Sequence, residues 1–352
     1  MARRNIEAAI QASQELELEG KLLPCKIPSS YSKLESYKVI SSQQELDGVY
    51  SLQYSPDGSM LAVGTGNEAM RLYDTASGKH IEDLRQPRYG GFPVKSLRWH
   101  PYDHHILYGA TCNGMIYALN VKSHTCTAVV SERKNEINCL DFSADGSTFA
   151  TAGKDLAVRI YDTKTCKEIK CYEGYSNATP AEDTEVQGHG MRVFALKHSP
   201  DNSHILLSGG WDNHIKVWDI RTSDGVKRTI AGPHICGDAL DLKGLRILTG
   251  SWVGENSLQL WDYTSGNLIK NIPFPSGHDG EYLYAAQFCE NDTVVAGGSG
   301  TKSIKAINST TCEVLGEIEL NGKCVNTLDT TRGGQLVAVG GMINSVTIGV
   351  IS

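Results

Sequence analysis

A short apolar strand that closes on Asp or Asn recurs along most of this chain. The clearest copies end at Asp74, Asp162, Asp219 and Asp262, and weaker copies end at Asn120 and Asn308. A seventh apolar strand, which lacks the final Asp or Asn, ends at Val350. Successive ends are 46, 42, 57, 43, 46 and 42 residues apart. Repeats of roughly 40–45 residues are typical of architectures in which each unit is a small β-sheet. The spacing therefore predicts seven such units, with an insertion inside the gap of 57.

Each unit also has the same interior. In the first unit, residues 49–54 alternate between apolar and polar, and the turn Ser55-Pro56-Asp57-Gly58 leads into a second apolar run at 60–63. Pro, Asp and Gly supply the restricted and left-handed backbone angles that such turns need. Alternation with a period of two, interrupted by regular turns, predicts antiparallel strands in every unit.

The fourth unit is the most complete. It contains Gly188-His189, then Ser208 and Asp212, and then Trp218 followed by Asp219. With these residues and seven phased repeats, the chain resembles the WD-repeat family over about residues 35 to 352. The resemblance implies an all-β fold, a single seven-bladed β-propeller. It also implies that His189, Ser208, Asp212 and Trp218 form a buried hydrogen-bond network, since a buried indole N–H and a buried carboxylate both need partners.

The two ends of the repeat region complement each other. Unit seven stops after its third strand, and residues 37–42 provide a spare apolar strand ahead of unit one. In similar proteins the first strand of the chain completes the last blade, which leaves no open sheet edge. We therefore expect the propeller to span residues 35–352. Residues 1–34 are expected to form an N-terminal extension, with a short helix at 3–19 followed by a linker.

Two segments outside the repeats have open roles. The 3–19 helix either docks on a partner or is a poorly ordered terminus. The insertion at 172–188 is acidic, and it either contacts a partner or is a tolerated surface loop.

Net charge, cysteine spacing and the motifs of the sequence argue against several classes of function. The formal net charge of −7 makes nucleic acid an unlikely partner. None of the ten cysteines forms a C-x-x-C pair, so we expect no metal site. We found no catalytic motif and expect no small-molecule cofactor. We expect Asp141, Asp241 and Asp329, which recur at similar places, to lie on the outer surface of the repeats.

Targeting signals are also missing from the sequence. The N-terminus has no signal-peptide core, and no apolar run approaches the roughly 20 residues that cross a bilayer. We expect no membrane association and a location in the cytoplasm or the nucleus.

Candidate binding residues follow from the resemblance. It implies that residues flanking the first apolar position of each unit line the mouth of a central channel, on the same face as the bends that carry Trp211 and Trp252. In the fifth unit that apolar position is Gly237, so its neighbour Asp238 is the least certain member of the set. The predicted partner-binding residues are Tyr50, Lys95, Glu136, Asn138, Arg192, Phe194, Trp211, Asp238, Trp252, Tyr282, Tyr284 and Asn326.

Aromatic residues and Arg are enriched at binding hot spots. The leading hypothesis is therefore a non-enzymatic scaffold or adaptor that binds a peptide or a partner domain within a multiprotein complex. An alternative is a reader of methylated or basic peptides, with Tyr50, Phe194, Tyr282 and Tyr284 as an aromatic cage. A third class is an enzyme or a subunit of an enzyme complex. The aromatic residues are equally compatible with a plugged channel mouth.

Overall fold

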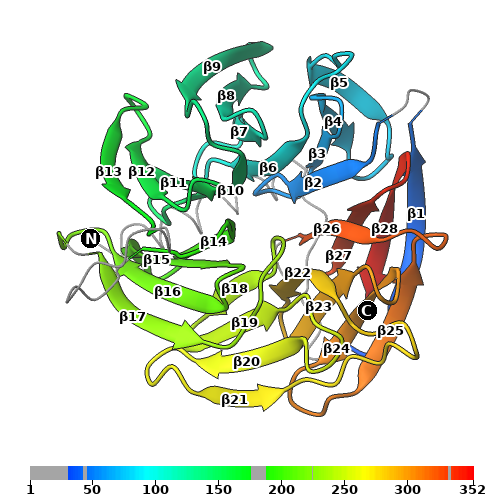
Figure 1. Cartoon of the computed structure of the whole chain (residues 1–352). Coiled ribbons are helices and arrows are strands. Elements are labelled where there is room, and N and C mark those ends of the chain that lie inside the picture. The colour runs from blue at the N-terminus through cyan, green and yellow to red at the C-terminus, as the bar shows by residue number, and fades with distance from the viewer. Residues whose placement is uncertain (1–30, 43–45, 176–187, 224, 332–333) are drawn as a thin grey trace, which may run out of the picture.

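Twenty-eight β-strands and no helix make up the part of the chain that the computed structural model describes, residues 31–42, 46–175, 188–223, 225–331 and 334–352. The strands form seven four-stranded antiparallel sheets, arranged as blades around a central axis (Figure 1). The predicted all-β, seven-bladed propeller is therefore confirmed. The helix predicted at 3–19 and residues 176–187 of the insertion lie outside the described residues. In the described ranges no helix is long and apolar enough to span a bilayer.

The blades follow the chain in order, and each has its first strand innermost. Blade 1 consists of β2 (Val49–Tyr54), β3 (Met60–Thr65), β4 (Met70–Asp74) and β5 (His80–Arg85). Blade 2 consists of β6 (Val94–Trp99), β7 (Ile106–Thr111), β8 (Met115–Asn120) and β9 (Thr125–Ser131). Blade 3 consists of β10 (Ile137–Phe142), β11 (Thr148–Gly153), β12 (Val158–Asp162) and β13 (Glu168–Tyr172). Blades 4 and 5 are β14 (Val193–Ser199), β15 (Asn202–Gly210), β16 (His214–Asp219) and β17 (Val226–Ala231); and β18 (Leu240–Lys243), β19 (Arg246–Gly250), β20 (Leu258–Asp262) and β21 (Leu268–Asn271). Blades 6 and 7 are β22 (Leu283–Phe288), β23 (Thr293–Gly298), β24 (Ser303–Asn308) and β25 (Val314–Glu319); and β26 (Val325–Thr330), β27 (Leu336–Gly341), β28 (Ser345–Ile351) and β1 (Leu34–Ser41).

Local chemistry explains the hairpins. In the first blade, the Ser55 hydroxyl donates to Asp57 at 2.5 Å, and Gly58 has a φ of 72°. This left-handed angle favours glycine, which has no Cβ to clash. The turn fixes the register in which β3 pairs with β2, from Val49 opposite Thr65 to Tyr54 opposite Leu61.

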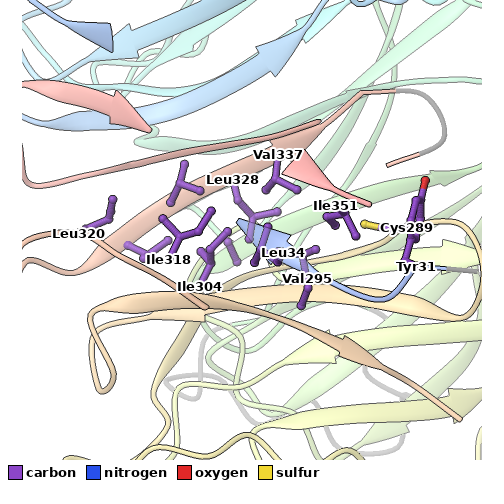
Figure 2. Close-up of a cluster of buried hydrophobic side chains, with 14 residues drawn as sticks. Tyr31, Leu34, Cys289, Val295, Ile304, Ile318, Leu320, Leu328, Val337 and Ile351 are labelled. Carbon is purple, nitrogen blue, oxygen red and sulfur yellow. The ribbon is translucent and has the colours of Figure 1, made fainter. Parts of the chain in front are cut away.

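The ring closes through its first and last strands. β1 pairs antiparallel with β28 along its length, and Lys33 and Ser352 exchange backbone hydrogen bonds of 3.0 and 2.9 Å. Leu34 and Tyr31 are buried among side chains of blades 6 and 7 (Figure 2). The predicted closing strand is therefore present, although it spans 34–41 rather than 37–42. The predicted boundary between residues 34 and 35 falls inside the fold, which includes Tyr31.

The apolar core lies between the blades. The cluster at the junction of blades 7 and 1 combines Val49 and Leu61 with Val346 and Ile348, all at most 2% exposed. Comparable clusters fill the other junctions, so each blade is stabilised by its two neighbours. The first strands are left to border a central channel, whose two mouths lie on opposite faces. We call the face with the loops that enter each first strand the upper face, and the face with the turns between first and second strands the lower face.

Candidate functional site

The upper face carries most of the predicted binding residues in three groups. The first group spans blades 3 and 4. The Phe194 and Trp211 rings lie 5.0 Å apart, and the Arg192 guanidinium lies 5.7 Å from the Trp211 ring. Arg192 also forms a 2.8 Å ion pair with Glu136. The Trp211 Nε1–H donates to the Cys236 thiol at 2.9 Å, and burial raises the pKa of that thiol to about 11, so it stays neutral.

The second group spans blades 5 and 6. The Trp252 ring lies 5.2 Å from the Tyr282 ring and 6.4 Å from the Tyr284 ring, and Trp252 is 40% exposed. Tyr282 has a φ of 42°, in the left-handed region that a bulky side chain rarely adopts. Blade 1 has Gly48, with a φ of 86°, at the equivalent place before its first strand. A tyrosine is thus held where glycine would be unstrained, a pattern that concentrates at functional sites.

The third group is a single pair. The Lys95 ammonium lies 5.0 Å from the centre of the Tyr50 ring. Burial lowers the pKa of Lys95. This pair places a cation on the side of the mouth formed by blades 1 and 2.

Three further predicted residues bond to the backbone of a neighbouring blade or to a group inside the channel. The side-chain amides of Asn138 and Asn326 donate to the backbone carbonyls of Val193 and Val49, at 2.9 and 3.0 Å, and so join neighbouring blades. Asp238 forms a 2.7 Å ion pair with Arg98 inside the channel. The hydrogen bonds and the ion pair of these three side chains stabilise the channel mouth, so their polar groups are less available to a partner.

The four rings of the proposed aromatic cage are divided among the three groups. Phe194 contacts Trp211, while Tyr282 and Tyr284 each contact Trp252. Tyr50 faces Lys95, so no two of the four cage rings are in contact with each other.

The unusual fifth unit has a steric explanation. A Cβ added to Gly237 would lie 2.2 Å from the backbone carbonyl oxygen of Tyr284, so no side chain fits there. The backbone of blade 6 therefore takes the space that the apolar residue fills in the other blades.

The expectation for Asp141, Asp241 and Asp329 is wrong. All three line the central channel and not the outer surface. They lie near the ends of the innermost strands, which border the channel, and each carboxylate accepts a backbone N–H from a neighbouring blade. The donors are His198 for Asp141, Phe288 for Asp241 and Tyr54 for Asp329, at 2.7, 2.8 and 2.7 Å. These aspartates therefore link blades from inside.

The residues of the expected network in blade 4 lie in contact. His189 lies 2.8 Å from Asp212 and 2.5 Å from the Ser208 hydroxyl, which accepts the Trp218 indole N–H at 2.7 Å. Burial lowers the pKa of His189, which favours the neutral ring. The network ties the loop before β14 to β15 and β16.

Blade 3 has no histidine at this place and uses Glu132 instead. The Glu132 carboxylate accepts from the Tyr161 hydroxyl at 3.0 Å and also from Thr151, and it pairs with Arg159 at 3.3 Å. The sequence signal was weak because Glu132 lies in a loop and not in a repeat motif.

Four exposed apolar residues of the upper face were also not predicted. They lie in the loops that enter β6 and β14 and in the bend between β27 and β28, outside the positions that the resemblance considers. They are Tyr89, Phe92, Met191 and Met342. A search for large apolar residues in these loops would have found them.

Comparison with known proteins agrees with this architecture. The family described as "WD domain, G-beta repeat" matches residues 124–162 and 182–219, and the "Anaphase-promoting complex subunit 4 WD40 domain" matches residues 31–100. Among curated relatives, "Cell division cycle 20.1, cofactor of APC complex" of Arabidopsis thaliana is 27% identical over 77% of this chain and 56% of its own length. "WD repeat-containing protein slp1" of Schizosaccharomyces pombe is 26% identical over 71% of this chain and 48% of its own length. "Anaphase-promoting complex subunit cdc20" of Dictyostelium discoideum is 27% identical over 74% and 49%.

The chain therefore spans about half the length of the curated relatives that it matches. Seven four-stranded blades, the phased repeats and the family matches lead to the same assignment. The repeats and the family matches support a WD-repeat chain, and its described part forms a single seven-bladed propeller.

Proposed function

We propose that the chain is a non-enzymatic adaptor that binds a segment of a partner protein on the upper face of the propeller. The observation that carries this proposal is the aromatic surface of blades 4 to 6, which we define as Phe194, Trp211, Trp252, Tyr282 and Tyr284. Aromatic side chains supply large contact area at a small cost in conformational entropy.

Charge around this surface favours a particular mode of binding. Arg192 and Lys154 both pair with the single carboxylate of Glu136, so one positive charge remains in excess there. A partner segment with an apolar anchor and a nearby acidic group would match this arrangement.

The relatives suggest the kind of assembly. Two of those compared are named as a cofactor or a subunit of the anaphase-promoting complex. By similarity, we propose that this chain works inside a multiprotein complex in the cytosol or the nucleus, and that the anaphase-promoting complex is the first one to test.

The test compares two double variants of the full chain by affinity purification and quantitative mass spectrometry. Trp252→Ala/Tyr284→Ala removes two of the five rings of the aromatic surface, and Tyr102→Ala/Leu245→Ala removes two exposed apolar side chains from the lower face. Loss of a hot-spot aromatic typically costs about 2 kcal/mol, so we expect upper-face partners to fall at least roughly tenfold in the first variant only. Binding of purified anaphase-promoting complex is measured with the same variants. An unchanged set of partners in the first variant would contradict the proposed site.

A further inference from the structure

A cavity opens at the lower mouth of the channel, on the face opposite the aromatic surface. We call it the lower-mouth cavity. It has a volume of about 320 Å³, close to the lower limit of about 300 Å³ for ligand pockets. Trp99, Phe142, Pro56 and Pro101 line it but do not line the smaller inner cavity of about 70 Å³. Tyr54, Ser55 and Thr330 also line only the lower-mouth cavity, so its outer wall combines apolar side chains with hydroxyl groups.

Polar groups lie at its inner end. Five residues line both cavities and so stand where the two meet: Gln53, Arg98, Asp141, Gln287 and Asp329. The Gln287 amide donates to Asp329 at 3.2 Å, but its Oε1 atom is buried and has no hydrogen-bond partner in the described part of the chain. A buried acceptor without a donor costs free energy, so this oxygen favours a ligand that donates.

The charges of the channel indicate which ligand. The inner cavity is lined by four carboxylates and two cations: Asp141, Asp238, Asp241 and Asp329, with Arg98 and Lys197. Arg98 pairs with Asp141 and Asp238 at 3.2 and 2.7 Å, and Lys197 pairs with Asp241 at 2.9 Å. Of the four carboxylates, Asp329 alone has no cation within salt-bridge distance among the described residues. Burial without a paired cation raises the pKa of Asp329 to about 6.

A metal ion does not fit this site as well. The described residues contain no group of three His, Cys, Asp or Glu side chains that could hold a metal, whereas hard cations take six or more oxygen ligands. An organic cation needs only one carboxylate and one carbonyl oxygen, and its aliphatic stem can lie along an apolar wall.

We propose that the lower-mouth cavity binds a primary alkylammonium group, the chemistry of a lysine side chain of a partner protein. The ammonium donates to the Asp329 carboxylate and, once the Gln287 amide rotates, to its Oε1 atom, which is buried in the present rotamer. The aliphatic stem lies against Phe142 and the two prolines. The site is independent of the upper face, so the adaptor would contact its partners on both faces of the ring.

The test uses n-butylammonium chloride as the probe and n-butanol as its neutral match, at equal ionic strength, with binding followed by saturation-transfer NMR. A ligand of this size binds with a Kd on the order of millimolar. We expect Asp329→Asn to weaken n-butylammonium binding at least roughly tenfold.

Two control variants separate this site from other effects. Asp279→Asn removes the same charge from an exposed position and leaves binding unchanged, and so does Trp252→Ala on the upper face. Affinity should also fall as the pH drops below about 6, because Asp329 then becomes protonated. Asp141 remains ionised in this range, since the His198 N–H and Arg98 outweigh burial and lower its pKa to about 2. Equal binding of n-butanol, or full binding by Asp329→Asn, would overturn the proposal.

Discussion

Asp329 shows at the scale of one residue how the channel sets stability. An acid whose pKa is raised in the folded state stabilises the fold only while it is protonated. Its contribution is present below the unfolded pKa of about 3.9 and is lost as the pH rises through about 6. In Asp329→Asn the amide oxygen still accepts from Tyr54, and the new amide N–H can donate to Gln287 Oε1 after the Gln287 amide rotates.

We therefore expect Asp329→Asn to unfold with a higher free energy than the wild type at pH 8, by roughly 1 to 3 kcal/mol, and with nearly the same free energy at pH 4. Urea unfolding across this pH range measures the difference. A difference that is the same at both pH values would show that Asp329 does not titrate between them.

Other residues mark the limit of reasoning from sequence at this scale. Arg192, Phe194 and Trp252 could be placed on the upper face because the resemblance to the WD-repeat family assigns a place to each position of the repeat. The channel contacts could not, because Asp329 bonds Tyr54 across 275 positions in sequence, and a single unit contains no sign of that partner. Glu132 was missed for a different reason: it lies in a loop outside the repeat motif, although the Tyr161 hydroxyl that it accepts from is only 29 positions away.

Strand β1 carries the main consequence at the scale of elements. Leu34 and Ile40 are 4% and 6% exposed, while Tyr37 and Val39 on the same strand are 61% and 56% exposed. Each buried side chain contributes about 1.5–3 kcal/mol, and without β1 the polar edge of β28 would be open. We expect deletion of residues 34–41 to cause unfolding or aggregation, measured by thermal melting and size-exclusion chromatography.

The exposed side of β1 provides the control for that deletion. Tyr37→Ser/Val39→Thr keeps the strand and its hydrogen bonds with β28 and removes only apolar surface that is in solvent. Its melting temperature should stay within a few degrees of the wild type. A deletion variant that melts like this control would mean that β1 does not close the ring.

Most of the elements could be predicted, because alternation and turn residues recur in every unit. The exceptions are physical in origin. β18 begins at Leu240, later than its counterparts in the other blades, and the Ala239 N–H just before it bonds back to the Gly237 carbonyl at 2.8 Å in a tight turn. β1 is longer than predicted because its pairing with β28 continues to Leu34, beyond the apolar run that the sequence shows.

At the scale of the whole molecule, we expect the ring to need its strands in place but not in one particular chain order. Lys33 and Ser352 form a hydrogen-bonded antiparallel pair, the geometry that a two-residue hairpin closes. Lys243 and Arg246 are likewise paired across the two-residue turn Gly244-Leu245 between β18 and β19. A Cβ at Gly244 would meet nothing within 4 Å, and the Leu245 side chain is 61% exposed. The Leu245 carbonyl, which accepts from the Tyr263 N–H at 2.9 Å, is kept when the chain is opened between these two residues.

A circular permutant tests this directly. It begins at Leu245, joins Ser352 to Lys33 through Asn-Gly, and ends at Gly244. One short hairpin is closed and one is opened, so the loop entropy is nearly unchanged. We expect its melting temperature to lie within about 10 °C of a linear 33–352 chain, with the same circular dichroism. Because β1 is then joined to β28 like the outer strand of any other blade, the permutant should also resist the loss of that strand by fraying. Failure of the permutant to fold would mean that the order in which the blades form, and not only their packing, decides whether the propeller closes.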